Sequence, residues 1–544
     1  MKKLIFLLSI LFVACTDELE KYPLDAPSTE TFLKTENELK TAIAGCMNPL
    51  TLRFGENPYA IWFEMYSDIA TNRDSRPESL WGDPGGGNVG TIWNTAYRGI
   101  GRCNFLINNI DRASENVSEA IIQNISSQAK FLRAYYYFLL SEFYGGVPLI
   151  TKTLDLSEAM VTRNSKEEVT AFILKELDEA AANLSATNQP NTMAITKGAA
   201  WALAARVALY NGKWQQSIDA AQKVMALEGS QYILNPKYGD ICMRVGKTSK
   251  EIIWAIQFNY DDIFHQTPLS FRSRLASGYC NRLPVQSLVD SYDCIDGLPI
   301  DKSPLYNAAK PFENRDPRLG QTIALPGSVY FGYQFETHKD SLFCWNYKVT
   351  PAVRVANLDA THTYASFSGY AWRKYSDPTE TDATKSDINP IIMRYAEVLL
   401  NYAEAKIEAN NIDESVYTAL NKIRTRAGMP VISTGKSQEE LRSVVRKERK
   451  AELAGEGLRY YDILRWRIAE QVLNGPCYGR IPRGYLSSAP AIDANGTPDY
   501  SKVSNAGAMR VIQTRIFDKN KNYLWPIPAI ELQTNSKLVQ NPNY

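Results

Sequence analysis

The sequence predicts a mainly α-helical protein of stacked, tetratricopeptide-like helical hairpins that carries a loop-rich, aromatic-rich insert. Three patterns lead to this fold class. Helix-start signatures precede segments in which apolar residues recur three and four positions apart. Large and small residues alternate along several of these segments, which lets neighbouring helices approach closely. Between about residues 258 and 385 the helical period fades and turn dipeptides appear.

The chain begins with an export signal. Lys2 and Lys3 precede the apolar run from Leu4 to Ala14, and Cys15 follows directly. The run is too short to cross a bilayer, which needs about 18 to 20 apolar residues. It resembles a bacterial lipoprotein signal, so we expect residues 1–14 to be cleaved and Cys15 to be the acylated lipid anchor. The alternative is ordinary signal-peptidase cleavage that leaves Cys15 as a free thiol.

The segment TDELE after Cys15 resembles the export tag of surface-exposed lipoproteins in Bacteroidetes. We therefore expect the protein to be anchored in the outer membrane and to face the cell exterior. Sixty basic against fifty-nine acidic residues leave a net charge of +1, which gives no electrostatic footprint for nucleic acid or anionic lipid.

Seven further cysteines show no C-x-x-C pair, and an odd number does not suggest a disulfide framework or a zinc site. We expect most of them to be small buried hydrophobic residues, and Cys280 and Cys294 are the one pair worth checking. The seven are Cys46, Cys103, Cys242, Cys280, Cys294, Cys344 and Cys477.

Three helix starts follow from S/T-x-x-E signatures at residues 35–38, 165–168 and 437–440, where hydroxyl and carboxylate satisfy each other's backbone amides. Residues 194–227 indicate two helices joined at 211–213. Similar alternation recurs elsewhere, so several helical hairpins are expected to stack.

We expect residues 15–544 to form a single domain with three parts. About 30–257 form the N-terminal helical part, about 258–385 the loop-rich insert and ligand surface, and about 386–544 the C-terminal helices with a closing segment. A second irregular patch covers residues 72–93. Long irregular segments in a compact protein are usually functional or disordered, and their aromatic density argues against disorder.

With these segments in view, the sequence resembles the SusD/RagB family of outer-membrane nutrient-binding lipoproteins. Five blocks occur in the expected order: FLRAYYYFLLSEFYGGVPLI (131–150), 394–410, 420–430, 446–466 and the ending YLWPIPAIELQTNSKLVQNPNY. The resemblance implies a SusD-like helical fold with a loop-built ligand surface. It also implies a partner, a SusC-like TonB-dependent outer-membrane transporter over which the lipoprotein sits as a lid.

Several motifs have more ordinary interpretations. GGGNVG at 85–90 lacks the preceding strand of a dinucleotide site, so its glycines are expected to let a loop bend. Glu448, Glu452 and Glu456 recur every fourth residue among arginines 446, 449 and 459, which favours a structural ladder along one helix over an acid/base pair. The three histidines do not have the spacing of metal ligands, and the sequence contains no G-x-S-x-G elbow of a hydrolase. We expect no cofactor.

A sugar binder needs flat rings against the apolar face of the sugar and polar groups for its hydroxyl rim. Trp81, which lies in a glycine-rich loop, is the best candidate for the stacking platform. Asp68, Arg73, Asp83 and Asn88 lie near it in sequence. The alternative for any one aromatic is a packing role, which we expect for Trp93 and Trp201 on helical patterns.

The insert supplies further candidates for the ligand surface. The aromatic ones are Tyr279, Tyr330, Tyr333, Trp345 and Tyr347, with His265 and Arg272 as polar partners. We expect a non-enzymatic binder that captures oligosaccharides or polysaccharide and delivers them to the transporter. A peptide or glycopeptide ligand is the alternative within binding, and a glycoside hydrolase, with two carboxylates flanking the substrate, is the alternative class.

The lipid-anchor prediction is tested by replacing Cys15 with Ala. We expect the variant to lose its acyl chains and to leave the outer-membrane fraction, because each buried methylene contributes about 0.8 kcal/mol to membrane attachment. Metabolic labelling with a fatty acid and cell fractionation measure both effects. A variant that stays in the outer membrane without detectable lipid would contradict the prediction.

Overall fold

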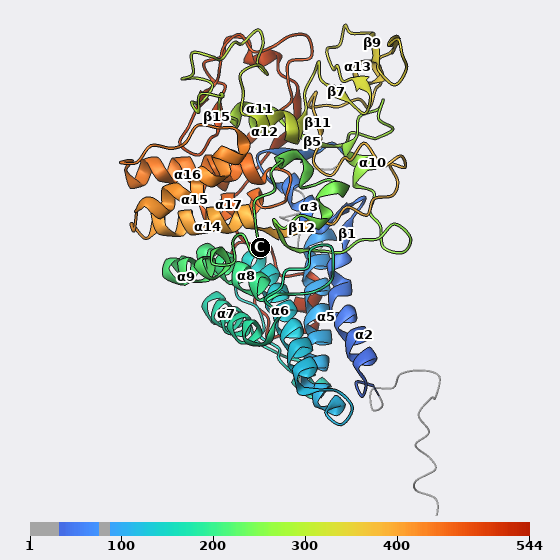
Figure 1. Ribbon diagram of the computed structural model, residues 1–544, viewed down its shortest axis with the longest axis vertical. Coiled ribbons are helices and arrows are strands. Elements are labelled where there is room, and N and C mark those ends of the chain that lie inside the picture. Colours follow the sequence, from blue (N-terminus) through green and yellow to red (C-terminus); the bar gives the residue numbers. More distant parts are fainter. Residues whose placement is uncertain (1–31, 75–86) are drawn as a thin grey trace, which may run out of the picture.

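The main helices stack next to one another in the order of the chain (Figure 1). The computed structural model describes residues 32–74 and 87–544, and every structural statement concerns these residues. The long helices are α2 (Glu36–Met47), α5 (Gly87–Asn109), α6 (Glu119–Tyr144), α7 (Lys166–Asn183), α8 (Lys197–Tyr210), α9 (Trp214–Met225), α14 (Tyr395–Glu408), α15 (Glu414–Ala427) and α16 (Gln438–Leu453).

Each helix of the stack packs against the next one along the chain. α5 contacts α6, α6 contacts α7, α7 contacts α8, and α8 contacts α9. The stack then continues from α9 to α14, although Met225 and Tyr395 are far apart in sequence, and α14 packs against α15 and α16. The prediction of a mainly α-helical fold of stacked hairpins is confirmed.

The local helix signals are confirmed as well. α2, α7 and α16 each begin with a capping box, formed by Thr35 with Glu38, by Ser165 with Glu168 and by Ser437 with Glu440. The hairpin expected at 194–227 is formed by α8 and α9, which are separated by residues 211–213.

Aromatic side chains of α6 fill the core between the helices and the C-terminal segment. Phe143 stacks on Trp525 with ring centroids 4.4 Å apart. On the facing helix α5, a Cβ at Gly99 would lie 2.3 Å from the Tyr136 ring, so only glycine allows this close approach. Trp93 is buried as expected, and Trp201 is partly buried against the core.

The upper part of the molecule in Figure 1 consists of short elements joined by loops. Its short helices include α10 (Thr267–Phe271), α11 (Gln286–Ser291), α12 (Pro317–Thr322) and α13 (Leu358–Thr361). α3 (Tyr59–Trp62), α17 (Arg459–Arg465), α18 (Ala469–Val472) and α19 (Ala529–Thr534) complete the α-helices of the described residues.

The strands are short and mostly paired in twos. One antiparallel sheet has four strands in the order β10-β9-β8-β7, formed by Val353–Ala356, Phe343–Asn346, Tyr333–Gln334 and Val329–Tyr330. The pairs are β1 (Arg53–Phe54) with β2 (Asn57–Pro58), β3 (Ala70–Asn72) with β5 (Arg282–Pro284), β6 (Ile323–Ala324) with β11 (Ala371–Trp372), β4 (Ile252–Ala255) with β12 (Ile391–Arg394), β13 (Gly475–Tyr478) with β16 (Val511–Arg515), and β14 (Ala491–Ile492) with β15 (Pro498–Asp499).

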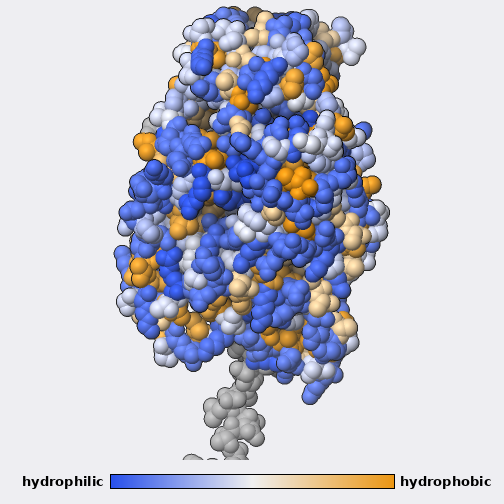
Figure 2. Space-filling model, turned by 90° about the vertical axis from the view of Figure 1, so that its left-hand side faces the viewer, coloured by the Kyte–Doolittle hydropathy of each residue, from blue (hydrophilic) through white to orange (hydrophobic). Residues whose placement is uncertain are grey.

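The seven described cysteines are buried, as expected for small apolar side chains. Cys280 and Cys294 lie in two different hydrophobic clusters and form no disulfide with each other. Within residues 32–74 and 87–544, no helix combines the length and the apolar composition that crossing a bilayer requires. The face on which α7, α9 and α14 to α16 lie is mainly hydrophilic with scattered apolar patches (Figure 2).

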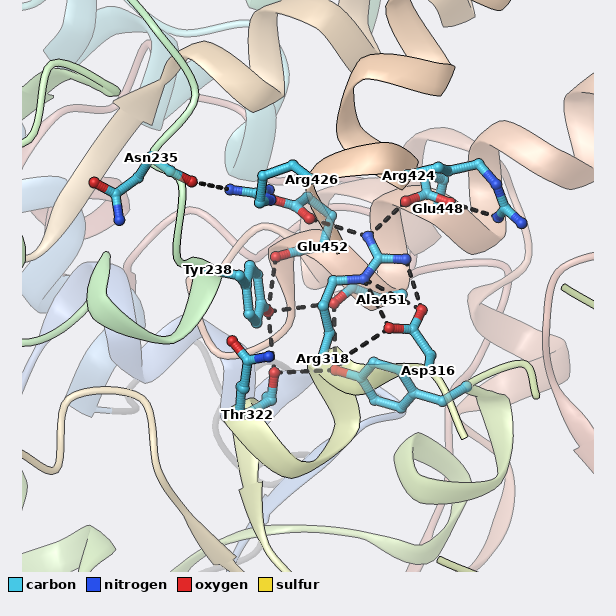
Figure 3. Close-up of polar contacts among 12 residues, drawn as sticks. Asn235, Tyr238, Asp316, Arg318, Thr322, Arg424, Arg426, Glu448, Ala451 and Glu452 are labelled. Carbon is cyan, nitrogen blue, oxygen red and sulfur yellow. Dashed lines mark hydrogen bonds and ion pairs between the residues drawn. The ribbon is translucent and has the colours of Figure 1, made fainter. Parts of the chain in front are cut away.

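A buried network of charges joins the upper part to the helical stack (Figure 3). The Glu452 carboxylate on α16 accepts hydrogen bonds from Arg318 of α12 (3.0 Å), from Arg394 at the end of β12 (2.7 Å) and from Arg426 of α15. On the same helix, Glu448 accepts hydrogen bonds from Arg318 (2.5 Å) and from α15 (3.0 Å). Four separate elements are thereby held together.

The network corrects one sequence-based interpretation. The three glutamates were expected to pair with arginines along their own helix, but their partners come from other elements. Glu456 lies beyond the end of α16 and pairs with Lys374 and Arg394 at 2.6 and 2.7 Å. A spacing of four residues also places side chains on one buried face of a helix, and here that face meets cations from distant parts of the chain.

We expect Glu452→Gln to lower the free energy of unfolding by roughly 3 to 5 kcal/mol, because it leaves three buried arginines without their shared charge. Glu439→Gln on the exposed first turn of the same helix is the matched control, with an expected change within about 0.5 kcal/mol. Urea unfolding at neutral pH, followed by circular dichroism, measures both. Equal effects of the two substitutions would show that the network does not stabilise the fold.

Candidate ligand-binding surface

Arg73 links two loops that carry exposed aromatic rings. It follows β3, whose pairing with β5 runs from Ala70 opposite Pro284 to Asn72 opposite Arg282. This pairing brings the Arg73 guanidinium to the loops at 272–281 and 362–367. Its Nη1 donates hydrogen bonds to the backbone carbonyls of Tyr279 (3.1 Å) and Tyr364 (2.9 Å).

The same guanidinium lies 5.4 Å from the ring centroids of both Tyr364 and Phe367. The Tyr364 side chain is 56 % exposed and that of Tyr279 is 42 % exposed. Exposed rings held by a fixed cation offer flat faces on which an apolar sugar face can stack.

Two further arginines flank the rings. Arg274 donates a hydrogen bond to the Tyr364 carbonyl (3.2 Å), and its guanidinium lies 5.8 Å from the Tyr279 ring. Arg510 precedes β16 and lies 3.7 Å from the Phe367 ring centroid. We call this group the aromatic–arginine surface: Arg73, Arg274, Tyr279, Tyr364, Phe367 and Arg510.

The local electrostatics are positive. His362 stands next to this surface, and its pKa is lowered by partial desolvation and then by the charges of Arg274 and Arg73, so its ring is neutral at neutral pH. Asp74 is ionised: desolvation opposes this, but a hydrogen bond from Asn281 and the neighbouring arginines lower its pKa. The surface therefore offers guanidinium donors and aromatic faces.

Two of the predicted ligand residues, Arg73 and Tyr279, are brought together here. Four others are corrected, because their side chains are buried and bonded to the protein. Asp68 pairs with Arg459 (2.8 Å) and Lys450 (3.3 Å), whose charges, against the effect of burial, hold its pKa below the ordinary range.

The other three buried residues lie in the irregular part. His265 contacts the Ile388 carbonyl through Nε2 at 2.8 Å, and burial lowers its pKa to about 4. Arg272 donates hydrogen bonds to the carbonyls of residues 377 and 380, and the Tyr330 hydroxyl donates one to the Trp372 carbonyl at 2.8 Å. A ligand on the surface cannot reach these groups.

The remaining predicted ligand residues do not belong to the aromatic–arginine surface. Asn88 donates its amide hydrogen bond to the Tyr66 hydroxyl at 2.8 Å. Trp81 and Asp83 lie outside the described residues, so their role as a platform stays a prediction. Trp345 is 38 % exposed on β9 with Arg354 5.2 Å from its ring centroid.

The neighbours of Trp345 share its sheet. Tyr347, just after β9, is 45 % exposed, and the Lys348 ammonium lies 4.5 Å from the Tyr333 ring. The sheet connects to the aromatic–arginine surface through α13, because Asp359 of that helix accepts a hydrogen bond from the Leu275 amide at 3.2 Å.

Sequence reasoning missed Arg274, Tyr364, Phe367 and Arg510. HTYASF at 362–367 has two aromatic residues three positions apart in a polar segment, a signal comparable to that of the predicted loops. The sequence around Arg510 gives no signal of a binding role, because Arg510 reaches the aromatic–arginine surface only through the pairing of β16 with β13. Among the described residues, no cluster of three or more His, Cys, Asp or Glu could hold a metal ion.

Two family models match the chain. One, described as the SusD family, matches residues 250–544, and the other, described as starch-binding associating with outer membrane, matches residues 56–209.

Relatives and solved structures agree with these matches. A SusD-like protein P2 of Formosa agariphila is 25 % identical over 100 % of this chain and 99 % of its own length. A SusD-like protein of Bacteroides ovatus is 24 % identical over 98 % of this chain and 95 % of its own. The crystal structure of a SusD-like carbohydrate-binding protein from Bacteroides fragilis superposes with a TM-score of 0.80 at 26 % identity, covering 94 % of this chain and 100 % of that one.

Proposed function

The chain belongs to the SusD/RagB family, and from this premise we propose that it is a cell-surface lipoprotein that captures oligosaccharides or polysaccharide. The observation that carries the proposal is the aromatic–arginine surface, where two exposed tyrosine rings and the Phe367 ring lie beside three guanidinium groups. The carbohydrate-binding description of the Bacteroides fragilis relative supports the same ligand class.

Binding at this surface follows from its chemistry. The C–H face of a sugar stacks on the Tyr364 or Tyr279 ring, and such aromatic contacts contribute about 0.5 to 1.5 kcal/mol beyond the area they bury. Arginine N–H groups donate hydrogen bonds to the sugar oxygens at the rim. The predicted platform Trp81 follows Arg73 by eight positions in the sequence, and its part in ligand binding stays a prediction.

The bound glycan is then delivered to a SusC-like TonB-dependent transporter. This part of the proposal is supported by the lipoprotein signal that ends at Cys15 and by the outer-membrane association named in the second family description. The acylated Cys15 keeps the binder at the outer membrane, beside its partner.

Two alternatives are separated by simple assays. A peptide ligand, or a glycopeptide held through its peptide part, would bind without competition from free glycans. A glycoside hydrolase would release new reducing ends from a glycan panel, and any turnover above a heat-treated control would favour the enzyme.

We expect Tyr364→Ala to weaken glycan binding at least tenfold, because truncating an exposed platform removes both stacking and contact area. The unfolding temperature should change little, since the ring is more than half exposed. Affinity electrophoresis against a panel of polysaccharides and calorimetry with oligosaccharides measure the loss. Tyr347→Ala, on a similarly exposed tyrosine of the four-stranded sheet, is the control, and loss of binding in that variant alone would move the site to the sheet.

The transporter partner is tested by co-purification from detergent-solubilised outer membranes. We expect a SusC-like barrel to accompany the protein through a broad polar face, since the helical face in Figure 2 carries no long apolar stripe. Recovery only as a free monomer, under conditions that keep other barrels intact, would contradict the prediction.

A further inference from the structure

Like charges gather around the loop at 360–367. The guanidinium groups of Arg73, Arg274 and Arg510 all contact its aromatic rings or its backbone. Lys339 donates a hydrogen bond to the Ala360 carbonyl at the other end of this loop, at 2.6 Å. Four cations therefore surround one short segment, although the net charge of the whole chain is only +1.

These cations are close enough to disfavour one another. Burial lowers the pKa of Arg510, and the charge of Arg73 lowers it further. Burial likewise lowers the pKa of Lys339, followed by the charges of Arg510 and Arg483. The cluster thus stores electrostatic repulsion that a negative ligand would relieve.

The neighbouring carboxylates neutralise only part of the cluster. Asp74 accepts a hydrogen bond from Arg73 at 3.1 Å, but its other oxygen is bonded to Asn281 and to Arg282, which lies away from the rings at the β3–β5 pair. Asp359 is buried and accepts a backbone amide; burial raises its pKa to about 6 although the charge of Arg274 lowers it, so this carboxylate offsets part of the charge of Arg274.

In the described part of the chain, Arg274, Arg510 and Lys339 have no ion pair with a carboxylate. Nearby cations of the same region differ in this respect: Arg483 pairs with Asp340 at 2.9 Å and Arg480 with Glu336 at 3.7 Å. Among the described residues, Arg274, Arg510 and Lys339 thus lack the ion pairs that these two neighbours have.

We propose that the glycan bound at the aromatic–arginine surface is acidic, with carboxylate or sulfate groups that Arg274, Arg510 and Lys339 bind. The inference rests on the proposed function, because it assigns the charge of the ligand at the same site. Guanidinium groups bind both acidic groups through paired N–H donors, and the adjacent tyrosine rings stack on the sugar that carries them.

The test compares polysaccharides that differ only in charge. One pair is polygalacturonate and the neutral galactan obtained by reducing its carboxyl groups, and the other is dextran sulfate and dextran. We expect at least one acidic member to bind the intact protein at least tenfold more tightly than its neutral counterpart. The preference should fall as salt rises from about 0.05 to about 0.3 M, since screening weakens charge contacts at a surface. Which pair shows the preference distinguishes carboxylate from sulfate recognition.

Charge-removing variants locate the effect. Arg274→Gln and Arg510→Gln should each reduce the acidic preference roughly threefold to tenfold, because each weakens binding of the acidic member more than binding of its neutral counterpart. Arg510→Lys keeps the charge and should retain most of the preference. Lys175→Gln removes one exposed cation from α7 and is the control, with no expected effect.

The outcomes separate this inference from the function on which it rests. Neutral and acidic members bound equally, with no effect of salt or of the arginine variants, would overturn the acidic ligand and leave glycan binding standing. An acidic preference that Lys175→Gln reduces as much as Arg510→Gln would show general attraction and overturn the site. No binding to any polysaccharide or oligosaccharide of the panel would overturn both proposals.

Discussion

The arrangement of the irregular part depends on the pairing of the Glu452 carboxylate with three arginines. The carboxylate is fully buried, and a buried charge is tolerated only when several partners compensate the loss of water. Its three arginines come from α12, β12 and α15, so satisfying this one group fixes the positions of three elements relative to α16. Against the effect of burial, the same arginines hold its pKa well below the ordinary value, which keeps the group charged.

This constraint extends to the ligand-binding loops. The segment that carries Tyr364 and Phe367 leads into β11, and Lys374, two residues beyond that strand, pairs with Glu456 next to the network. Hydrophobic packing alone would allow short strands and loops to slide over a helical surface. Paired charges prevent such sliding, because each pair requires a defined position and direction. This positional specificity offsets the cost of burying the charges.

The sequence was sufficient for features that depend on neighbours in the chain. The three capping boxes and the α8–α9 hairpin follow from spacing alone, and so does the helical class. Partners of buried polar residues could not be predicted in this way. Asp68 and Arg272 look like exposed ligand residues in a polar context, but Arg459 and the carbonyls of 377 and 380 reach them only after folding. Arg510 joins the surface for the same reason.

Arg73 joins the two ligand-binding loops through their backbones, whereas the ligand meets their side chains. Nη1 of Arg73 donates to backbone carbonyls of Tyr279 and Tyr364, so these hydrogen bonds do not depend on which side chains the two residues carry. A different ring or a polar group at either position would leave the cross-link between the loops in place. The helical stack and the buried charges can therefore stay constant while the exposed side chains change. In this chain the exposed side chains combine aromatic faces with arginines, two of which have no ion pair among the described residues.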